Sequence, residues 1–232
     1  MIFGHSGDLG DIIYALPTIR AMGGGDLVLF DLPGRTAHGM TESKVERIKP
    51  LLMLQDYIHS VQWSPFPVHT NINGFRDHMI HGNLADAHLA THELDWTHRT
   101  TPWLQVDKPR YEYDVVIHRS ERYHNQNFPW TDVLEQYHGR IGYVGFPEEH
   151  SAFCNNFGEV PRIEAPDFLE LARVIHGAKL FIGNQSSPLA VAHGMFKTLI
   201  MEICPGGAQH HCVFQRMGCI IGWDRKLIFP QL

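Results

Sequence analysis

Short apolar strands alternate with helices along most of the chain, and this alternation constrains the fold more than any other feature of the sequence. Apolar residues recur at helical spacing over residues 12–22, three glycines at 23–25 end that helix, and residues 26–31 form a predicted buried strand. A strand, a loop, a helix and a second strand in this order are the building block of a parallel sheet. The sequence therefore predicts an α/β protein.

The same alternation predicts the other elements. Helices are expected over residues 41–55, 83–94, 128–138, 148–157, 166–177 and 188–196. Strands are expected over residues 57–63, 113–118, 141–146, 178–183 and 198–204. Little regular structure is expected over residues 64–82. Pro50 is expected to kink or split the helix over residues 41–55. Because the alternation restarts after a polar, aromatic connector at 96–109, we predict two lobes, residues 1–108 and residues 109–232.

Charge and cysteine usage narrow the class of protein. The 232 residues include 19 Lys and Arg against 25 Asp and Glu, a formal net charge of −6, which argues against general binding to a phosphate backbone. The chain contains no run of 18 apolar residues, so no membrane span is predicted. The short, polar N-terminus is unlike a signal peptide. The cysteines lack CxxC spacing, so we expect reduced thiols and a cytoplasmic location. Cys204, His210, His211 and Cys212 match no structural zinc pattern, and no metal is predicted.

A glycine-rich loop with two aspartates links the first predicted strand to the first helix. Its chemistry-bearing residues are His5, Ser6, Gly7, Asp8, Gly10 and Asp11. Glycine lets a backbone approach a phosphate or a sugar closely, but the loop lacks a Walker lysine and the spacing of a dinucleotide fingerprint. The aspartates would repel a phosphate and suit a hydroxyl that must lose its proton. Asp11 is therefore either a catalytic base or a helix cap.

Two loops that follow strands in the second half suit an anion. Arg119 and Arg122 follow the strand at 113–118, and paired arginines suit a diphosphate; the alternative is a solvated charged loop. Gln185, Ser186 and Ser187 form a small polar turn before a helix, whose amides and hydroxyls suit an anion without any lysine. The alternative for this turn is a plain capped helix.

A third loop in the second half carries two carboxylates. Glu148 and Glu149 follow the strand at 141–146 and open the next helix. A carboxylate at the end of such a strand can bind the two hydroxyls of a ribose. Acidic residues in a first helical turn also simply complement the helix dipole.

Taken in order, these loops resemble the heptosyltransferase family, which transfers sugars from nucleotide donors. Residues 5–17 (HSGDLGDIIYALP) resemble the family's first loop and helix, and residues 181–194 (FIGNQSSPLAVAHG) resemble its second-lobe signature. Residues 145–149 (GFPEE) are similar to its Gly-x-Pro-x-Glu turn. The resemblance implies the GT-B fold, with two facing Rossmann-like lobes, parallel sheets and, in this short chain, a reduced first lobe.

The resemblance also implies roles for the site residues. The proposed general base of the family falls on Asp11, and its phosphate-binding basic residue on Arg119 or Arg122. The ribose-binding glutamate falls on Glu149, with Glu148 as the alternative, and the turn that meets the diphosphate on Ser186 and Ser187. This chain departs from the family pattern at three positions: Gln185 replaces an aspartate, Ser187 a glycine and Ala190 a histidine. Because the reduced first lobe would hold the acceptor, a lipopolysaccharide acceptor is not implied.

These inferences predict a glycosyltransferase that inverts the anomeric centre and needs no metal or cofactor. Its donor is expected to be a nucleoside-diphosphate sugar, and its acceptor a glycan, a lipid-linked sugar or a modified nucleic-acid base. One alternative is a nucleotide or nucleotide-sugar binding protein that has lost catalysis, of which Gln185 and Ala190 would be signs. Another is a transferase acting on modified DNA bases, for which one basic face is expected from Arg76, His78, His81, His88, His92, His98 and Arg99.

Overall fold

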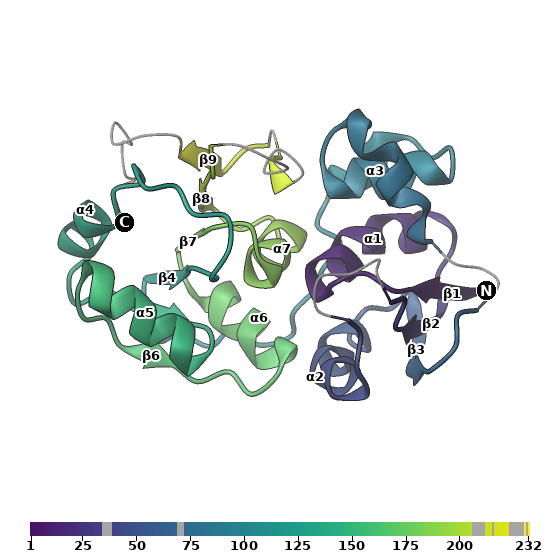
Figure 1. Ribbon diagram of the computed structural model, residues 1–232, viewed down its shortest axis with the longest axis horizontal. Coiled ribbons are helices and arrows are strands. Elements are labelled where there is room, and N and C mark those ends of the chain that lie inside the picture. Colours follow the sequence, from purple (N-terminus) through teal and green to yellow (C-terminus); the bar gives the residue numbers. More distant parts are fainter. Residues whose placement is uncertain (34–38, 69–71, 206–211, 215, 223–229, 231) are drawn as a thin grey trace.

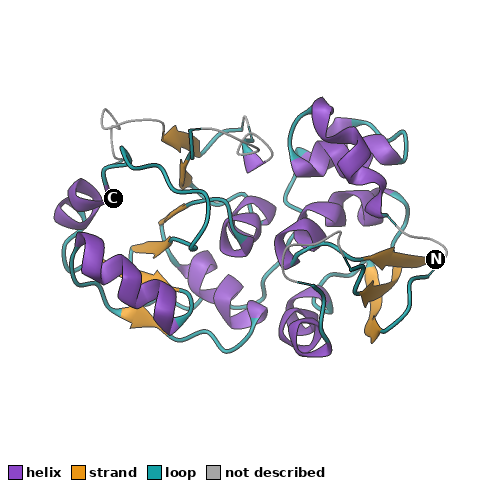
Figure 2. Ribbon diagram, viewed as in Figure 1, coloured by secondary structure: helices purple, strands orange, loops and turns teal. Residues whose placement is uncertain are grey.

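The computed structural model shows two parallel β-sheets, one from each half of the chain, with helices packed between them (Figure 1, Figure 2). The structure describes residues 1–33, 39–68, 72–205, 212–214, 216–222, 230 and 232. The predicted α/β class with parallel sheets is confirmed.

The first sheet has three parallel strands in the order β1-β2-β3. They are β1 (Ile2–His5), β2 (Gly25–Phe30) and β3 (Ile58–Ser64). Right after β1 comes α1 (Leu9–Ala21), and α2 (Glu42–Leu52) connects β2 to β3. The α2 helix contains Pro50 and is not split by it, and it ends at Leu52 rather than at the expected residue 55.

The segment between β3 and the second lobe is more ordered than the sequence predicts. It contains η1 (Asn73–His81), α3 (Leu84–Thr91) and η2 (Trp96–Arg99), where the η elements are 3₁₀ helices. The expectation of little regular structure over 64–82 was therefore wrong for η1. Tertiary packing holds η1 in place, because the buried Phe75 ring stacks on the His88 ring of α3 with centroids 4.1 Å apart.

The second sheet has six parallel strands in the order β6-β5-β4-β7-β8-β9. Its strands are β4 (Val115–His118), β5 (Ile141–Val144), β6 (Arg162–Ile163), β7 (Leu180–Gly183), β8 (Leu199–Glu202) and β9 (Cys219–Gly222). Its helices are α4 (Trp130–Gln136), α5 (Pro147–Phe157), α6 (Phe168–Gly177) and α7 (Ser187–Gly194). The sequence analysis missed β6, which at two residues is too short for a periodic signal, and also the four-residue β9.

One hydrophobic core joins the two sheets. Helix α1 packs on α7 and α2 packs on α6, as seen at the centre of Figure 1. Eight consecutive residues of α1, from Ile12 to Ile19, are buried, so α1 is enclosed on all sides rather than amphipathic. The connector also contributes: Trp103 and Leu104 are buried, and both of their backbone N–H groups donate to the Gly194 carbonyl of α7. The lobe boundary at residue 108 stays a prediction.

Histidines are an unusual part of this interior. His5, His88 and His193 are fully buried, and burial lowers the pKa of each, for His88 to about 3. Each therefore stays neutral in the folded protein at pH values where an unfolded histidine is protonated.

Among the described residues, no helix is long and apolar enough to cross a bilayer.

These buried histidines predict a loss of stability in mild acid. Below pH 6.5 the unfolded chain binds protons that the folded chain does not, so the free energy of unfolding should fall by up to about 1.4 kcal/mol per pH unit for each histidine. The Asp11 carboxyl, whose pKa burial raises to about 6, acts in the opposite sense for one proton. Urea unfolding at pH 7.5 and pH 5.5 measures the difference.

The exposed His138 provides the control. His138→Gln should lose stability between pH 7.5 and pH 5.5 in parallel with the wild type. If the wild type were as stable at pH 5.5 as at pH 7.5, or more stable, the result would contradict the neutral state of the buried histidines.

Candidate active site

The loop between β1 and α1 is held by its own backbone amides. The Gly7 N–H donates to His5 Nδ1 at 2.9 Å, and the Ser6 N–H donates to Asn73 Oδ1 of η1 at 2.8 Å. Asp8 is the N-cap residue of α1. The predicted loop residues therefore cluster at the carboxyl end of β1, where open α/β sheets bind ligands.

Asp11 caps α1 and also faces a cation. Its Oδ2 accepts the Asp8 N–H at 3.2 Å and lies 3.3 Å from Arg76 Nη2. Among the described residues, its Oδ1 makes no hydrogen bond. The side chain is 18% exposed, and burial raises its pKa to about 6 against the opposing charges of Arg76 and Arg122. A carboxylate of this kind is ionised at neutral pH and basic enough to accept a proton from a hydroxyl.

The second-lobe loops meet where the strand order of the sheet reverses. The chain passes from β4 to β5 and β6 on one side and then returns to β7 on the other side of β4. At this switch point the buried Asn184 side chain, after β7, fastens the loop after β4: its Oδ1 accepts the Ser120 N–H at 2.9 Å, and its Nδ2 donates to the Arg122 carbonyl. Such switch points are the usual ligand sites of open α/β sheets.

The predicted polar turn starts α7. Ser186 is the N-cap residue, its Oγ accepting the Leu189 N–H at 3.4 Å and donating to the Asn184 carbonyl at 2.9 Å. Ser187 is the first helical residue, and Gln185 precedes the cap. Ser186 therefore caps α7, whose first amides lie at the switch point, and anion binding by this turn stays a prediction.

The structure brings the two motif loops into contact. A Cβ on Gly10 would lie 3.7 Å from Ser187 Cα and 3.8 Å from the Ser186 carbonyl oxygen. The amino ends of α1 and α7 are therefore neighbours, and the charge of Arg122 acts on Asp11 across the lobe boundary. The amino end of α7 and the exposed Arg122 together favour an anion, whereas Asp8 and Asp11 occupy the amino end of α1.

The two predicted phosphate-binding arginines differ in their environment. The Arg119 side chain is 9% exposed and is bound to the buried Glu202 of β8 through Nε and Nη2, at 3.0 and 2.9 Å. Glu202 also accepts the Asn125 N–H and the Trp130 indole N–H. The guanidinium of Arg119 is thus occupied inside the protein. Arg122 is exposed and remains the candidate for a diphosphate.

Glu149 lies at the same edge of the second sheet, at the start of α5. Its Oε2 accepts the Phe146 N–H at 3.0 Å, so it caps α5 as the dipole interpretation predicts. Its charge acts on the His118 ring at the carboxyl end of β4. Glu148 is exposed. Ribose binding by Glu149 or Glu148 stays a prediction.

Comparison with known proteins gives a match in structure alone. No family model matches the chain, and no curated protein matches it in sequence. The glycosyl transferase family 9 structure from Veillonella parvula DSM 2008 superposes with a TM-score of 0.61 at 12% identity, over 95% of this chain and 86% of that chain. E. coli ADP-heptose LPS heptosyltransferase II gives a TM-score of 0.61 at 11% identity, over 97% and 92%. E. coli heptosyltransferase WaaC with ADP gives 0.56 at 13%, over 96% and 93%.

The chain has the fold of glycosyltransferase family 9. The fold expected from the resemblance, with two facing Rossmann-like lobes, is confirmed. The first sheet, with three strands against six in the second, is the smaller one, as the reduced first lobe predicts.

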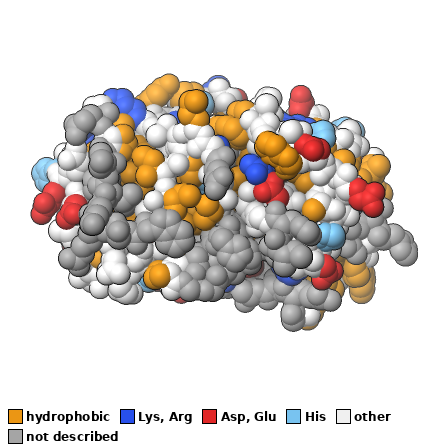
Figure 3. Space-filling view, turned by 90° about the horizontal axis from the view of Figure 1, so that it is seen from above, with side chains coloured by type: hydrophobic (Ala, Val, Ile, Leu, Met, Phe, Trp, Pro, Cys, Tyr) orange, Lys and Arg blue, Asp and Glu red, His pale blue; other side chains and the backbone are white. Residues whose placement is uncertain are grey.

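The basic face expected for the DNA-modifying alternative is contradicted at His88 and weakened at two arginines. His88 is buried, Arg76 is paired with Asp11, and Arg99 is paired with Asp86. The side chain of His81 lies outside the described residues. On the face shown in Figure 3, basic and acidic side chains are interspersed rather than gathered by sign.

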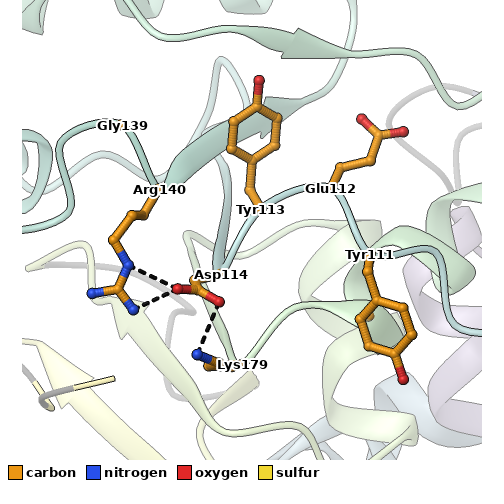
Figure 4. A pocket seen from close by; sticks show the side chains of 8 residues that line it. Tyr111, Glu112, Tyr113, Asp114, Gly139, Arg140 and Lys179 are labelled. Atoms are coloured by element: carbon orange, nitrogen blue, oxygen red, sulfur yellow. Dashed lines mark hydrogen bonds and ion pairs between the residues drawn. The ribbon is translucent and has the colours of Figure 1, made fainter.

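A cavity of about 380 Å³ lies away from this site, at the opposite edge of the second sheet. Asp114, Arg140 and Lys179 line it, and each immediately precedes a strand (Figure 4). Both cations bind the Asp114 carboxylate. This cluster ties together the amino ends of β4, β5 and β7, whereas the candidate site lies at carboxyl ends.

The four residues weighed for a zinc pattern lie only partly within the described structure. Neither Cys204 nor Cys212 forms a disulfide among the described residues, and His210 and His211 lie outside them. Within the part of the chain that the structure describes, three or more His, Cys, Asp or Glu side chains do not gather as metal ligands.

Sequence reasoning missed three residues that shape the site. Arg76, which pairs with Asp11, lies in a segment predicted to be irregular, and no local pattern marks it. Glu202, the last residue of β8 and 83 residues away in sequence, pairs with Arg119. Asn184 is the one with a detectable signal, because a buried amide in a tight polar turn must find partners for several polar atoms.

Gly7 and Gly10 form a matched pair for testing the loop. A Cβ on Gly7 would lie 2.5 Å from His5 Cε1 and 2.6 Å from Asp11 Cβ, whereas one on Gly10 meets only ordinary contacts. Gly7→Ala should therefore lower the free energy of unfolding by about 1–3 kcal/mol, and Gly10→Ala by much less. Urea unfolding of both variants measures this, and equal effects would contradict the described loop geometry.

Alanine substitutions of the two arginines should change the free energy of unfolding by different amounts in the same assay. Arg119→Ala leaves the buried Glu202 carboxylate without its cation and should lower the free energy of unfolding by about 3–5 kcal/mol. Arg122→Ala removes an exposed side chain and should change it by less than about 0.5 kcal/mol. A mild effect of Arg119→Ala would place its guanidinium outside the Glu202 network.

Proposed function

We propose that the protein is a glycosyltransferase that moves a sugar from a nucleoside diphosphate to an acceptor hydroxyl. The observation that carries this proposal is the position of Asp11. Its carboxyl, with a pKa raised to about 6, lies at the amino end of α1, directly beside the amino end of α7. A proton acceptor and an anion-favouring site are thereby adjacent, as transfer from a diphosphate requires.

Asp11 acts as the general base in this proposal. Its free Oδ1 takes the proton of the acceptor hydroxyl while that oxygen attacks the anomeric carbon. The new bond joins the acceptor oxygen to the anomeric carbon, and the bond from that carbon to the diphosphate breaks, with its electron pair leaving on the phosphate oxygen. Attack opposite to the leaving group inverts the anomeric centre.

In this proposal the diphosphate binds at the amino end of α7. The first amides of α7 point toward the switch point, and the exposed Arg122 supplies a full positive charge beside them. Arg119 contributes indirectly, because its pairing with Glu202 fixes the start of the loop that carries Arg122. These groups stabilise the leaving group without a metal ion. Glu149, at the neighbouring strand end, would hold the ribose.

An adenosine-diphosphate sugar is the first donor to test. The E. coli heptosyltransferase WaaC, which shares the fold, was solved with ADP and with ADP-2-deoxy-2-fluoro heptose. A nucleotide-sugar donor and reduced cysteines both fit a cytoplasmic location. The acceptor is a hydroxyl compound of a class still to be tested among glycans, lipid-linked sugars and modified bases.

Asp11→Asn separates catalysis from binding. Asparagine at position 11 keeps a side-chain oxygen that can accept the Asp8 N–H, so the fold should be retained, but it cannot take a proton. The rate of transfer should fall by about 10²–10⁴-fold with donor affinity unchanged. Arg122→Ala should do the reverse and weaken ADP binding by about 1.5–3 kcal/mol. Thermal shift with ADP and nucleotide sugars measures binding, and product analysis with candidate acceptors measures transfer.

Asp8→Asn is the control for this experiment. Asp8 lies in the same loop and is also replaced by a good cap, so this variant should keep most of the transfer rate. If Asp8→Asn abolished transfer and Asp11→Asn did not, the base would be wrongly assigned. If the wild type bound nucleotides with no transfer to any acceptor, the protein would be a binding protein instead.

A further inference from the structure

Two buried histidines contact each other directly beneath the Asp11 loop. His5 is the last residue of β1, and His88 lies in α3, 83 residues away. Their Nε2 atoms are 3.0 Å apart, and both side chains are fully buried. The Phe75 ring stacks on His88 and lies parallel to His5. Neither histidine has a part in the transfer chemistry described above.

The hydrogen bonds around this pair allow one arrangement of protons. The Gly7 N–H donates to His5 Nδ1, so that nitrogen carries a lone pair and the proton of a neutral ring is on Nε2. His5 Nε2–H then donates to His88 Nε2, which must also carry a lone pair. The remaining proton of His88 is on Nδ1 and donates to the Leu84 carbonyl at 2.7 Å. Protonating either ring would set two N–H groups against each other.

Gly7 transmits the position of His5 to Asp11. A Cβ on Gly7 would lie 2.5 Å from His5 Cε1 and 2.8 Å from Asp11 Oδ2, so the glycine backbone fills the space between the ring and the carboxylate. The Gly7 amide is bonded to the ring on one side. A displacement of the His5 ring must therefore move Gly7, and with it the carboxylate.

The other end of the pair reaches Asp11 by a second route. Phe75, stacked on His88, lies under the Arg76 guanidinium, whose carbon is 4.3 Å from the ring centroid. Arg76 in turn pairs with Asp11 Oδ2. The α3 and η1 segment thus fixes Asp11 through Arg76 and through His88, His5 and Gly7.

We propose that His5 and His88 are positioning residues for Asp11, with His88 imposing the Nε2–H tautomer of His5 that the Gly7 amide requires. The proposal rests on the proposed function for the role of Asp11. The hydrogen bonds inferred for the two histidines do not depend on that role.

The tautomers are tested on the unmodified protein. Long-range ¹⁵N–¹H spectra of the ¹⁵N-histidine-labelled protein at pH 7 distinguish the two neutral tautomers and the charged ring. We expect two neutral histidines of opposite tautomer, the less common Nδ1–H form for His88 and Nε2–H for His5, with His88→Gln assigning the signals. A charged ring, or the Nε2–H form at His88, would overturn the proposal without bearing on transferase activity.

Two substitutions at His88 test the coupling to Asp11. His88→Gln keeps an acceptor for His5 Nε2–H, whereas His88→Phe keeps the ring stack and removes the acceptor. We expect His88→Phe to shift the Asp11 carboxyl titration in ¹³C spectra and to lower the transfer rate about ten- to a hundredfold with ADP affinity unchanged, and His88→Gln to restore both. Identical Asp11 titrations in the wild type and His88→Phe would overturn the positioning role.

This design keeps the two proposals apart. A protein without transferase activity whose Asp11 titration still responds to His88→Phe would refute the proposed function and support the coupling. An active enzyme whose rate and Asp11 titration are unchanged in His88→Phe would do the opposite. Circular dichroism and thermal unfolding confirm that each variant is folded before it is compared.

Discussion

The packing of α1 against α7 is the contact on which the rest of the structure depends. A helix buried over eight consecutive residues cannot be the surface helix of an independent lobe, because it would expose an apolar face to water. The second lobe covers that face. The same contact sets the amino ends of both helices side by side, so the burial that stabilises the protein also assembles the candidate site.

The alternation of strands and helices was sufficient to predict the α/β class and the parallel sheets. Each of the strands β2–β5, β7 and β8 begins and ends within two residues of a predicted one, because their continuous or alternating apolar residues can be recognised in the sequence. The sequence could not reveal η1, which is held by the stacking of Phe75 on His88 rather than by local propensity. Nor could it reveal β6 and β9, whose pairing depends on neighbouring strands already being in place.

The candidate site was predictable where its chemistry is local and not where it depends on distant partners. The Asp11 loop and the Ser186 turn are contiguous motifs, and the structure brings them together. Arg119 and Arg122 look equivalent in sequence, yet Glu202 from another strand occupies one of them. Arg76 reaches Asp11 from a segment with no recognisable pattern. Long-range pairing of charges leaves no trace in the local sequence of either partner.

The shared core has a consequence for how such a chain can vary. Side chains of α1 and α2 from one half pack with those of α6 and α7 from the other, so each half serves as the solvent shield of its counterpart. A half taken from a distant relative would present a mismatched apolar surface. Recombination between genes near the connector would therefore lower the stability of the product at each mismatched contact. We therefore expect the two lobes to be inherited as a unit, with changes on one side of the interface compensated by changes on the other.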